Sequence, residues 1–535
     1  MIPINGISRI TENGKALLTA ERVSAMNRVT MNQLLRFSMI VWVLVTCLSP
    51  GSAPCSQSIP LTIVHLNDLH GHILPYMDKS VLQDQPVSGA AYLAAMIAQE
   101  RAKNPEGTLL LAAGDMFQGT PISNVFRGRS VIEIMDALKF DAMVLGNHEF
   151  DWGREALEAL RLAASFPFLA ANIVTKSGET LAGMKPYILL TRQGVRVAVI
   201  GVTTPETSFT TNPATVSDLV FQDPAQVLPP LIEQVRTEGA QVVILLSHLG
   251  LDADEQLAGQ IGGIDVIVGG HSHTAVTTPV RINNTIIVQA KCYGVYLGVL
   301  ELRIDGTTRK IVDYTTTNVL RTVVAAPQAP ADAGIAEIVS RYDDQVRTEF
   351  SKVVGSSAVD LQRQDYAESN LGNLITDAMR EASAADIAFQ NGGGIRADLP
   401  AGDITLEKLY TLLPFDNQMV VMDLKGSQIL ELLEKSGERH YRMLQVSGLT
   451  VEYDPTQPAG SRVVQVSVGG KPLQYDSTYR VATNDFLAAA GDQFTTFTHG
   501  RNLTYGDTLR EIVGTYLRKH SPVRPGLEQR MVWRQ

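Results

Sequence analysis

Residues 145–151 of the chain read Leu145-Gly146-Asn147-His148-Glu149-Phe150-Asp151. The apolar run just before them predicts a short buried strand, and Gly146 allows a sharp turn where a side chain would obstruct. Asn147 offers an amide oxygen to a cation, and His148 offers an imidazole that gives or takes a proton near neutral pH. Asp151 is placed to orient His148 and to favour its charged form. Taken alone, the stretch fits a capped turn with a solvated histidine equally well.

Short apolar runs that predict buried strands recur through the first half of the chain. Helical patterns at residues 89–103 and 129–138 separate the first three of these runs, and this alternation predicts an α/β fold. The runs are residues 61–66, 108–113, 142–145, 195–202, 241–246 and 264–268. Every run except 195–202 is followed closely by Asp, His or Asn. Because ligand sites of open α/β sheets lie at the carboxyl ends of strands, we expect these polar residues to converge on one site.

The polar residues at these strand ends form a set of metal-ligand types. They are Asp68, His70, Asp115, Asn147, His248, His271 and His273. A lone Asp or His after a strand usually caps or turns the chain, but five such strand ends are hard to explain by capping. The donors are oxygen and imidazole nitrogen without a thiolate, which suits zinc, manganese or iron. The set exceeds the needs of one tetrahedral ion and fits two ions about 3.5–4 Å apart that share a carboxylate, for which we expect Asp115.

The order of these motifs resembles that of the calcineurin-like metallophosphoesterases. The motifs are residues 67–71, 114–115, 146–149, 247–248 and 270–273. The likeness is strongest to the exported 5′-nucleotidase branch, which includes bacterial UDP-sugar hydrolases and animal ecto-5′-nucleotidase. It implies a four-layer α/β sandwich with two divalent metal ions, Zn, Mn or similar. Close relatives can carry Gln or Asn where this chain has His273.

The same resemblance implies which residues do what. One metal ion would be held by Asp68, His70, Asp115 and His273, and the other by Asp115, Asn147, His248 and His271. His148 would be a catalytic side chain outside the metal shell, paired with Asp151.

The composition changes after about residue 320. Residues 325–331 are typical of a linker, and residues 335–354 carry a polar helical pattern that predicts a connecting helix. Further on, a glycine triplet at 392–394 lets backbone amides approach an anion, and Arg396 adds a guanidinium fork for phosphate. A glycine-rich turn with one arginine is by itself more often only a loop.

Four segments of the second half resemble, in order, the nucleotide-binding C-terminal domain of the same family. They are residues 368–374, 390–396, 413–417 and 484–492. The resemblance implies a smaller α+β domain with the substrate-binding residues Asn391, Gly393, Arg396, Phe415, Phe486 and Asp492. Phe415 and Phe486 would sandwich a base, although phenylalanines in loops are more often core residues. Asp492 would hold the ribose hydroxyls, and Asn391 and Arg396 would contact the base side and the phosphate.

Two positions depart from the family pattern in this half. The usual Gly-Gly-Asp-Gly near the last segment is Ala490-Gly491-Asp492-Gln493 here. An arginine that helps to grip phosphate just before Glu368 has no clean counterpart, and Arg363 is the nearest candidate.

The N-terminus predicts export. Arg28 and Arg36 precede the apolar run 37–48, which has the length of a signal peptide and is too short for an ordinary membrane-spanning helix. We therefore expect a periplasmic or cell-surface protein. Cys55 leaves a lipid anchor open as an alternative, although Pro54 before it is a poor fit.

The chain is accordingly divided into four segments. They are residues 1–56, upstream extension and signal peptide; 60–325, metallophosphoesterase domain; 326–354, linker and connecting helix; and 355–525, nucleotide-binding domain.

Charge and cysteine content exclude two classes of protein. The net charge of −10 argues against binding to a nucleic-acid polymer, which favours a basic face. Cys292 could pair only with Cys55 once the signal is removed, so a scaffold built on disulfides is excluded. No Walker A motif, dinucleotide glycine fingerprint or serine nucleophile elbow is present, and we expect no organic cofactor.

The expected function is hydrolysis of nucleoside 5′-monophosphates by an exported two-metal 5′-nucleotidase. A 2′,3′-cyclic-nucleotide phosphodiesterase or a UDP-sugar hydrolase on the same scaffold stays open. More distant alternatives are a thiosulfohydrolase and a nucleotide-binding surface protein without turnover. The sequence predicts no oligomeric state.

Overall fold

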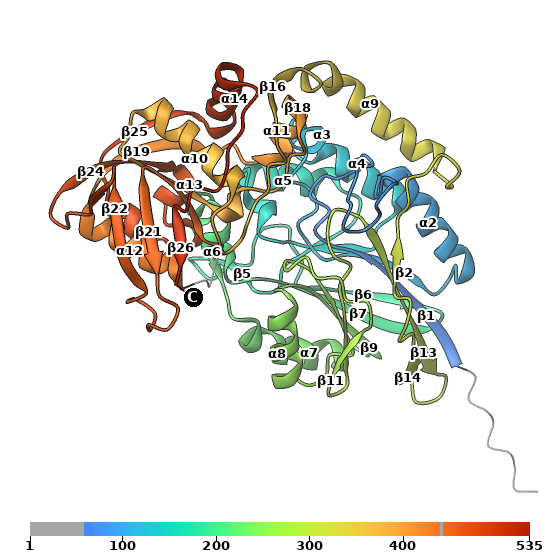
Figure 1. Cartoon of the computed structure of the whole chain (residues 1–535). Helices are drawn as coiled ribbons and strands as arrows, with labels where there is room; N and C mark the ends of the chain where they lie inside the picture. Colours follow the sequence, from blue (N-terminus) through green and yellow to red (C-terminus); the bar gives the residue numbers. More distant parts are fainter. Residues whose placement is uncertain (1–57, 439–441, 535) are drawn as a thin grey trace, which may run out of the picture. The chain divides into compact units, whose positions relative to one another are not determined.

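The computed structural model (Figure 1) describes residues 58–438 and 442–534 of the chain. The segment expected to hold the signal peptide, including Cys55, lies outside the described residues. Within them Cys292 is a buried free thiol. No helix in the described ranges combines the length and the apolarity that a membrane crossing requires.

The first sheet of the N-terminal domain carries three of the predicted ligand strands. Its order is β14 (Ile311–Tyr314), β13 (Tyr296–Asp305), β1 (Ser58–Leu66), β2 (Thr108–Ala112), β3 (Ala142–Val144) and β4 (Phe168–Leu169), and β15 (Leu320–Thr322) also pairs with β13. Strands β1 to β4 run parallel, so their carboxyl ends share one edge. The long strand β13 returns antiparallel beside β1.

The second sheet carries the other two ligand strands. Its order is β11 (Val280–Ile282), β12 (Thr285–Val288), β10 (Val266–Gly269), β9 (Val242–His248), β7 (Val195–Thr203) and β6 (Tyr187–Arg192). Strands β7, β9, β10 and β12 are parallel, and β9 is buried along its whole length. Because both faces of this sheet are covered, β9 needs apolar residues on both sides, which explains its nearly continuous apolar sequence.

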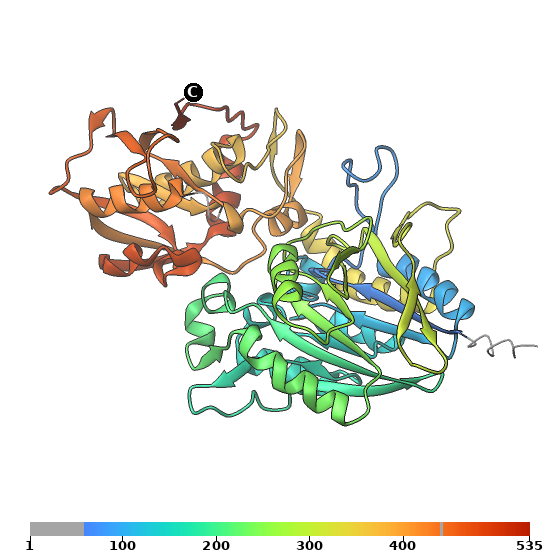
Figure 2. The ribbon, with the colours of Figure 1, turned by 90° about the horizontal axis from the view of Figure 1, so that it is seen from below.

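Helices cover the outer faces of both sheets, as Figure 1 shows for α2 and α9 on one side and α7 and α8 on the other. The helices are α2 (Ala90–Lys103), α4 (Arg129–Leu138), α5 (Arg154–Ala163) and α9 (Ala333–Phe350) over the first sheet, and α7 (Pro224–Thr237) and α8 (Leu251–Gln260) over the second. Separate hydrophobic clusters fill the space between the sheets and under each helix layer. In Figure 2 the green helices α7 and α8 lie in front of the sheets. The predicted four-layer α/β sandwich is confirmed.

Helix α9 differs at its ends from the helical pattern 335–354. It begins at Ala333, where the carboxylate of Asp332 accepts the backbone N–H of Ile335, and it ends at Phe350. Val353 and the residues after it instead form β16 (Val353–Ser357), which pairs with β18 (Gly402–Thr405). Strand pairing therefore ends the helix before its polar pattern ends.

The C-terminal domain is the smaller α+β unit that was predicted. Its central sheet has the order β20 (Leu444–Ser447), β17 (Ile387–Asn391), β24 (Thr478–Asn484), β19 (Gln418–Lys425) and β25 (Arg501–Thr508). Helices α10 (Asn370–Ser383) and α14 (Leu509–His520) share a hydrophobic cluster with one face, and α12 (Gly426–Gly437) shares one with the other. A second sheet joins β23 (Lys471–Pro472), β22 (Val463–Val468), β21 (Leu449–Tyr453) and β26 (Met531–Trp533).

Candidate active site

The predicted metal ligands come together at the carboxyl ends of the strands. Two groups of three side chains each offer ligand atoms that all lie within 4.8 Å of one another. The first group is Asp68, His70 and His273, and the second is Asp115, His248 and His271. Each group combines loops from both sheets of the sandwich, because Asp68 and Asp115 follow strands of the first sheet and the other sheet supplies His248, His271 and His273.

Asp115 lies between the two groups. Its Oδ2 is 3.1 Å from Nε2 of His248 and 3.7 Å from Nε2 of His70. Its other oxygen, Oδ1, accepts the backbone N–H of His148 at 2.9 Å. A carboxylate in this position can reach an ion in either group.

The protonation pattern of the histidines fits cation binding. Nδ1 of His70 donates to the carbonyl of Gln118 at 2.7 Å, and Nδ1 of His248 donates to that of Ala113 at 2.7 Å. In the neutral form of each ring, Nε2 carries the lone pair and faces the other ligands, the usual arrangement of metal-binding histidines. Nε2 of His70 lies 3.3 Å from Nε2 of His273, which itself lies 3.3 Å from Oδ1 of Asp68.

Among the predicted metal ligands, two buried polar atoms have no hydrogen-bond partner in the described part of the chain. They are Nε2 of His248 and Oδ1 of Asn147. Burial lowers the pKa of His248, but the carboxylate of Asp115 outweighs this effect and raises the pKa to about 10. A divalent cation would satisfy the same electrostatic demand without a proton, so the residues present fit metal binding.

Backbone strain marks the same loops. Five of the predicted ligands have positive φ: Asp68 (50°), His70 (49°), Asp115 (53°), His271 (73°) and His273 (56°). Each such residue costs roughly 1–3 kcal/mol, and such strain gathers at functional sites. Gly146 allows the close packing, since a Cβ there would lie 2.2 Å from Oδ1 of Asp115.

Glu149 is a structural anchor of the site that the sequence did not single out. Its buried carboxylate accepts the backbone N–H groups of Asp115 at 2.9 Å, Met116 at 2.9 Å and Gly146 at 2.6 Å. It thereby joins the loops that follow β2 and β3. Burial raises its pKa. The only local signal is an acidic residue within the motif, because the partners come from two separate loops.

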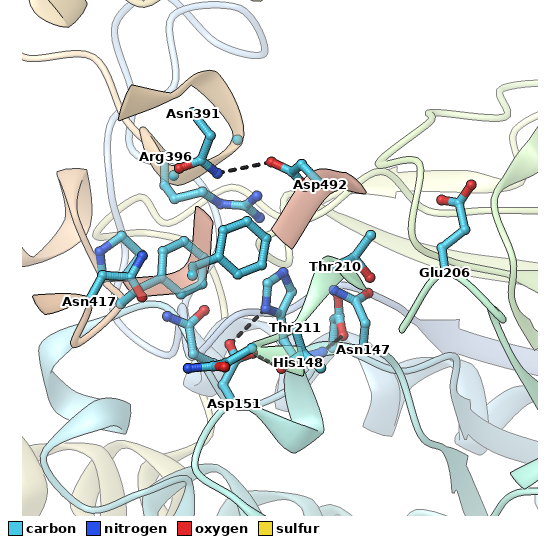
Figure 3. A pocket seen from close by; sticks show the side chains of 18 of the residues that line it. Asn147, His148, Asp151, Glu206, Thr210, Thr211, Asn391, Arg396, Asn417 and Asp492 are labelled. Atoms are coloured by element: carbon cyan, nitrogen blue, oxygen red, sulfur yellow. Dashed lines mark hydrogen bonds and ion pairs between the residues drawn. The ribbon is translucent and has the colours of Figure 1, made fainter. Parts of the chain in front are cut away.

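His148 and Asp151 form the predicted pair (Figure 3). Nδ1 of His148 donates to Oδ2 of Asp151 at 2.7 Å, and Oδ1 of Asp151 accepts from the hydroxyl of Thr211 at 2.7 Å. Thr211 is distant in sequence and was not expected. Burial lowers the pKa of His148, but the carboxylates of Asp151 and Asp115 outweigh it and the net pKa is raised. Because Asp151 is bonded to Nδ1, the charged imidazole can release the proton on Nε2.

A cavity of about 400 Å³ joins this centre to the C-terminal domain. All six predicted substrate-binding residues line it: Asn391, Gly393, Arg396, Phe415, Phe486 and Asp492. From the N-terminal domain it is lined by His148 and Asp151 and by the predicted ligands Asp115, Asn147, His271 and His273. Asp68, His70 and His248 lie behind that wall, each at most 2% exposed.

The predicted substrate residues do not all lie in the same surroundings. Nδ2 of Asn391 donates to Oδ2 of Asp492 at 3.0 Å (Figure 3), and burial raises the pKa of Asp492 to about 6 despite this bond. The ring of Phe415 stacks on His148, with centroids 5.5 Å apart, and the guanidinium of Arg396 lies 5.9 Å from the centre of that ring. Phe486 is only 8% exposed and belongs to the hydrophobic cluster under α12.

The second arginine of the cavity is Arg442. Among the described residues, the cavity lining includes Arg442 with Arg396 but not Arg363, the expected nearest counterpart of the family arginine. Arg442 forms an ion pair at 2.9 Å with Asp365, which lies shortly before Glu368 in the sequence. Its position in the loop before β20 gave no sequence signal, because that loop reaches the cavity only through the tertiary fold.

Comparison with known proteins supports this description. The family model "Calcineurin-like phosphoesterase" matches residues 61–275, and "5′-nucleotidase, C-terminal domain" matches residues 350–499. The chain is 33% identical to a snake venom 5′-nucleotidase of Naja atra, over 89% of this chain and 99% of that protein. It is 32% identical to the 5′-nucleotidase of Homo sapiens, over 89% and 92%.

A solved structure extends the similarity to the fold. The crystal structure of a 5′-nucleotidase precursor from Thermus thermophilus has a TM-score of 0.81 at 36% identity, and the match covers 89% of this chain and 99% of that one. Fold and site thus define a metal-dependent phosphoric ester hydrolase of the calcineurin-like class. Within that class, the chain belongs to the 5′-nucleotidase family.

Proposed function

We propose that this protein is an exported 5′-nucleotidase that hydrolyses nucleoside 5′-monophosphates to nucleoside and phosphate with two metal ions. The observation that carries the proposal is the cavity at the metal-ligand groups. It combines a site suited to phosphate on the N-terminal side with an aromatic and carboxylate surface suited to a nucleoside on the C-terminal side. A general phosphatase would not need the second surface.

The metal-binding residues are assigned from the two groups described above and from the family resemblance, which adds Asn147 and the sharing of Asp115. One ion would be held by Asp68, His70, Asp115 and His273, and the other by Asp115, Asn147, His248 and His271. Two divalent cations in such a site neutralise phosphate oxygens and lower the pKa of water. The oxygen and nitrogen donors suit zinc, manganese or similar ions.

The chain's own side chains would handle the rest of the reaction. Arg396 would hold the phosphate through its guanidinium fork. Water adds its oxygen to phosphorus while the bond from phosphorus to the 5′ oxygen of the nucleoside breaks. His148, oriented by Asp151, would give the proton on Nε2 to that departing oxygen.

The nucleoside would lie against the C-terminal domain. Phe415 and Phe486 would stack on the base, which is a sequence-tolerant mode of binding. Asp492 would accept hydrogen bonds from the ribose hydroxyls, and Asn391 and the backbone at Gly393 line the same wall. Asn391 orients Asp492 through its amide, so the two side chains act as a pair.

The proposal includes export of the protein and the boundaries of its domains. The signal-like segment before residue 57 supports export to the periplasm or cell surface. The names of two relatives, a venom protein and a precursor, agree with it. We keep residues 60–325 as the metallophosphoesterase domain, 326–354 as linker and connecting helix and 355–525 as the nucleotide-binding domain.

Phosphate release from a panel of substrates tests the function. The purified chain is given AMP, 2′,3′-cyclic AMP, UDP-glucose and p-nitrophenyl phosphate, with and without EDTA. We expect the highest kcat/KM on AMP and loss of all activity in EDTA. A higher kcat/KM on the cyclic nucleotide or the UDP-sugar would replace the 5′-nucleotidase assignment by that activity.

A further inference from the structure

The loop at residues 413–417 forms part of the cavity wall. It connects α11 (Leu406–Leu412) to β19, and its residues Pro414, Phe415, Asp416 and Asn417 all line the cavity. Figure 3 shows Asn417 among the side chains that surround the pocket. The loop has no regular secondary structure, so its backbone carbonyls need partners from elsewhere.

Arg510 supplies several of those partners. It lies at the start of α14, whose first turn is fixed by a capping box between Thr508 and Glu511. Nη1 of Arg510 donates to the carbonyls of Leu413 and Phe415, both at 2.8 Å, and Nη2 contacts the carboxylate of Asp416.

The surroundings of Arg510 fix its guanidinium in place. The side chain is only 6% exposed, and its guanidinium carbon lies 3.8 Å from the centre of the Tyr410 ring. The ring of Phe350 in turn packs edge-on against Tyr410, with centroids 4.8 Å apart. A buried arginine is costly unless its donors are satisfied. Within the described part of the chain, the hydrogen bonds of this guanidinium go to the cavity loop.

The loop is held at its other points as well. The backbone N–H of Leu509 donates to the carbonyl of Asn417 at 2.9 Å. From the N-terminal domain, the amide of Asn124 in α3 (Pro121–Asn124) donates to the carbonyl of Pro414 at 2.8 Å. Arg510 thus holds the middle of the loop, between the contacts of Asn124 and Leu509. The side chain of Phe415 projects from the loop toward His148.

We propose that Arg510 is a positioning residue for substrate specificity, because it holds the 413–417 loop in the conformation that presents Phe415 to the base of a nucleotide. Arg510 does not line the cavity and touches no reacting group; it acts through the loop. The inference rests on the proposed function, since it takes the nucleoside as the ligand of this wall. Arginine is suited to the role, because one planar fork can bond two carbonyls and a carboxylate together.

Kinetics on two substrates tests the proposal. Arg510→Met should raise KM for AMP about tenfold, within the range expected for lost base stacking. For p-nitrophenyl phosphate, which has no nucleobase, KM and kcat should stay within about twofold of the native values. The KM of Arg510→Lys for AMP should lie between those of the native protein and Arg510→Met, because an ammonium group replaces the planar fork with a single point of attachment. Arg518→Met, on the exposed side of the same helix, is the matched control and should change neither substrate.

A structural role alone would give a different result. Equal losses on both substrates, or an unchanged KM for AMP in a folded Arg510→Met protein, would overturn the proposal. Hydrogen exchange of the native protein and Arg510→Lys adds a readout that needs no substrate: amides in 413–418 should exchange faster in the variant, and unchanged exchange would also overturn it. If the native enzyme does not hydrolyse AMP, the proposed function fails, while the exchange experiment still decides whether Arg510 orders the loop.

Discussion

At the scale of single residues, Asp115 lies between the two groups of proposed metal ligands. One carboxylate oxygen accepts the N–H of His148, and the other lies near both His248 and His70. We predict that Asp115→Ala lowers kcat/KM by at least about 10³-fold, because a ligand shared by the two proposed ions would contribute several kcal/mol through both of them. Metal analysis should find fewer than two ions per chain. His271→Ala, which changes one group only, is the comparison, and an equal or larger loss there would contradict the bridging role.

His148 should behave differently from a metal ligand. Its Nδ1 is bonded to Asp151, and it belongs to neither ligand group. We predict that His148→Ala keeps the native metal content and lowers kcat by roughly 10²–10⁴-fold, the usual contribution of a positioned general acid. Asp151→Asn should cost less, because it weakens the orientation of the ring but leaves the ring in place. If His148→Ala loses metal, His148 is a metal ligand and the prediction is wrong.

At the scale of elements, β1 contains a buried histidine unrelated to the site. His65 is fully buried, and neither ring nitrogen is hydrogen-bonded to any residue that the structure describes; its ring packs against Gly298 of the neighbouring strand β13. Burial lowers its pKa from 6.5 to about 4. The neutral form is therefore favoured in the folded state, so stability is complete above pH 6.5 and is lost as the pH falls from 6.5 towards 4.

The loss from this one group should be about 2 kcal/mol between roughly pH 7.5 and pH 5. We predict that His65→Leu flattens the acid limb of the stability curve by this amount, measured by urea unfolding in EDTA so that metal release does not contribute. His499→Leu, at an exposed position, is the control. If the stability of His65→Leu falls with pH as steeply as that of the native protein, His65 does not cause the loss of stability in acid.

Elements with local patterns were predictable, and contacts between distant loops were not. The period of apolar residues located β1, β2 and α4 closely, since burial on one or both faces leaves a local trace. The proposed ligands could be recognised in the sequence because each one lies at the end of a strand or within a few residues after it. Glu149, Thr211 and Arg442 were missed as contributors because their partners belong to other loops, and nothing near them in sequence indicates the pairing.

At the scale of the whole molecule, the proposed metal ligands connect the two sheets of the N-terminal domain. Ligands after β1 and β2 come from one sheet, and those after β9 and β10 from the other. Because ions that bind only the folded state stabilise it, EDTA should lower the midpoint of thermal unfolding by several degrees as well as abolish activity. Mn²⁺, Co²⁺ or Zn²⁺ should restore both. In Asp115→Ala the shift should be clearly smaller, and a full shift there would show that EDTA acts elsewhere.

The last prediction depends on both domains, because the cavity takes the reacting centre from one and the proposed base-binding wall from the other. Phe415 and Phe486 looked equivalent in the sequence, but Phe415 lies on a loop beside His148 while Phe486 is packed into the C-terminal hydrophobic cluster. We predict that Phe415→Ala raises KM for AMP by about tenfold with the midpoint of urea unfolding unchanged.

Phe486→Ala should raise the same KM and also destabilise the protein by about 3 kcal/mol, the cost of truncating a buried phenylalanine. Neither change should alter KM for p-nitrophenyl phosphate by more than about twofold, because that substrate offers no base to stack. If Phe486→Ala lowers stability but leaves KM for AMP unchanged, Phe486 is a core residue only and Phe415 stacks on the base alone. If both variants lose the same fraction of kcat/KM on AMP and on p-nitrophenyl phosphate, the C-terminal wall does not bind the base. The enzyme is then a phosphoesterase without nucleoside selectivity.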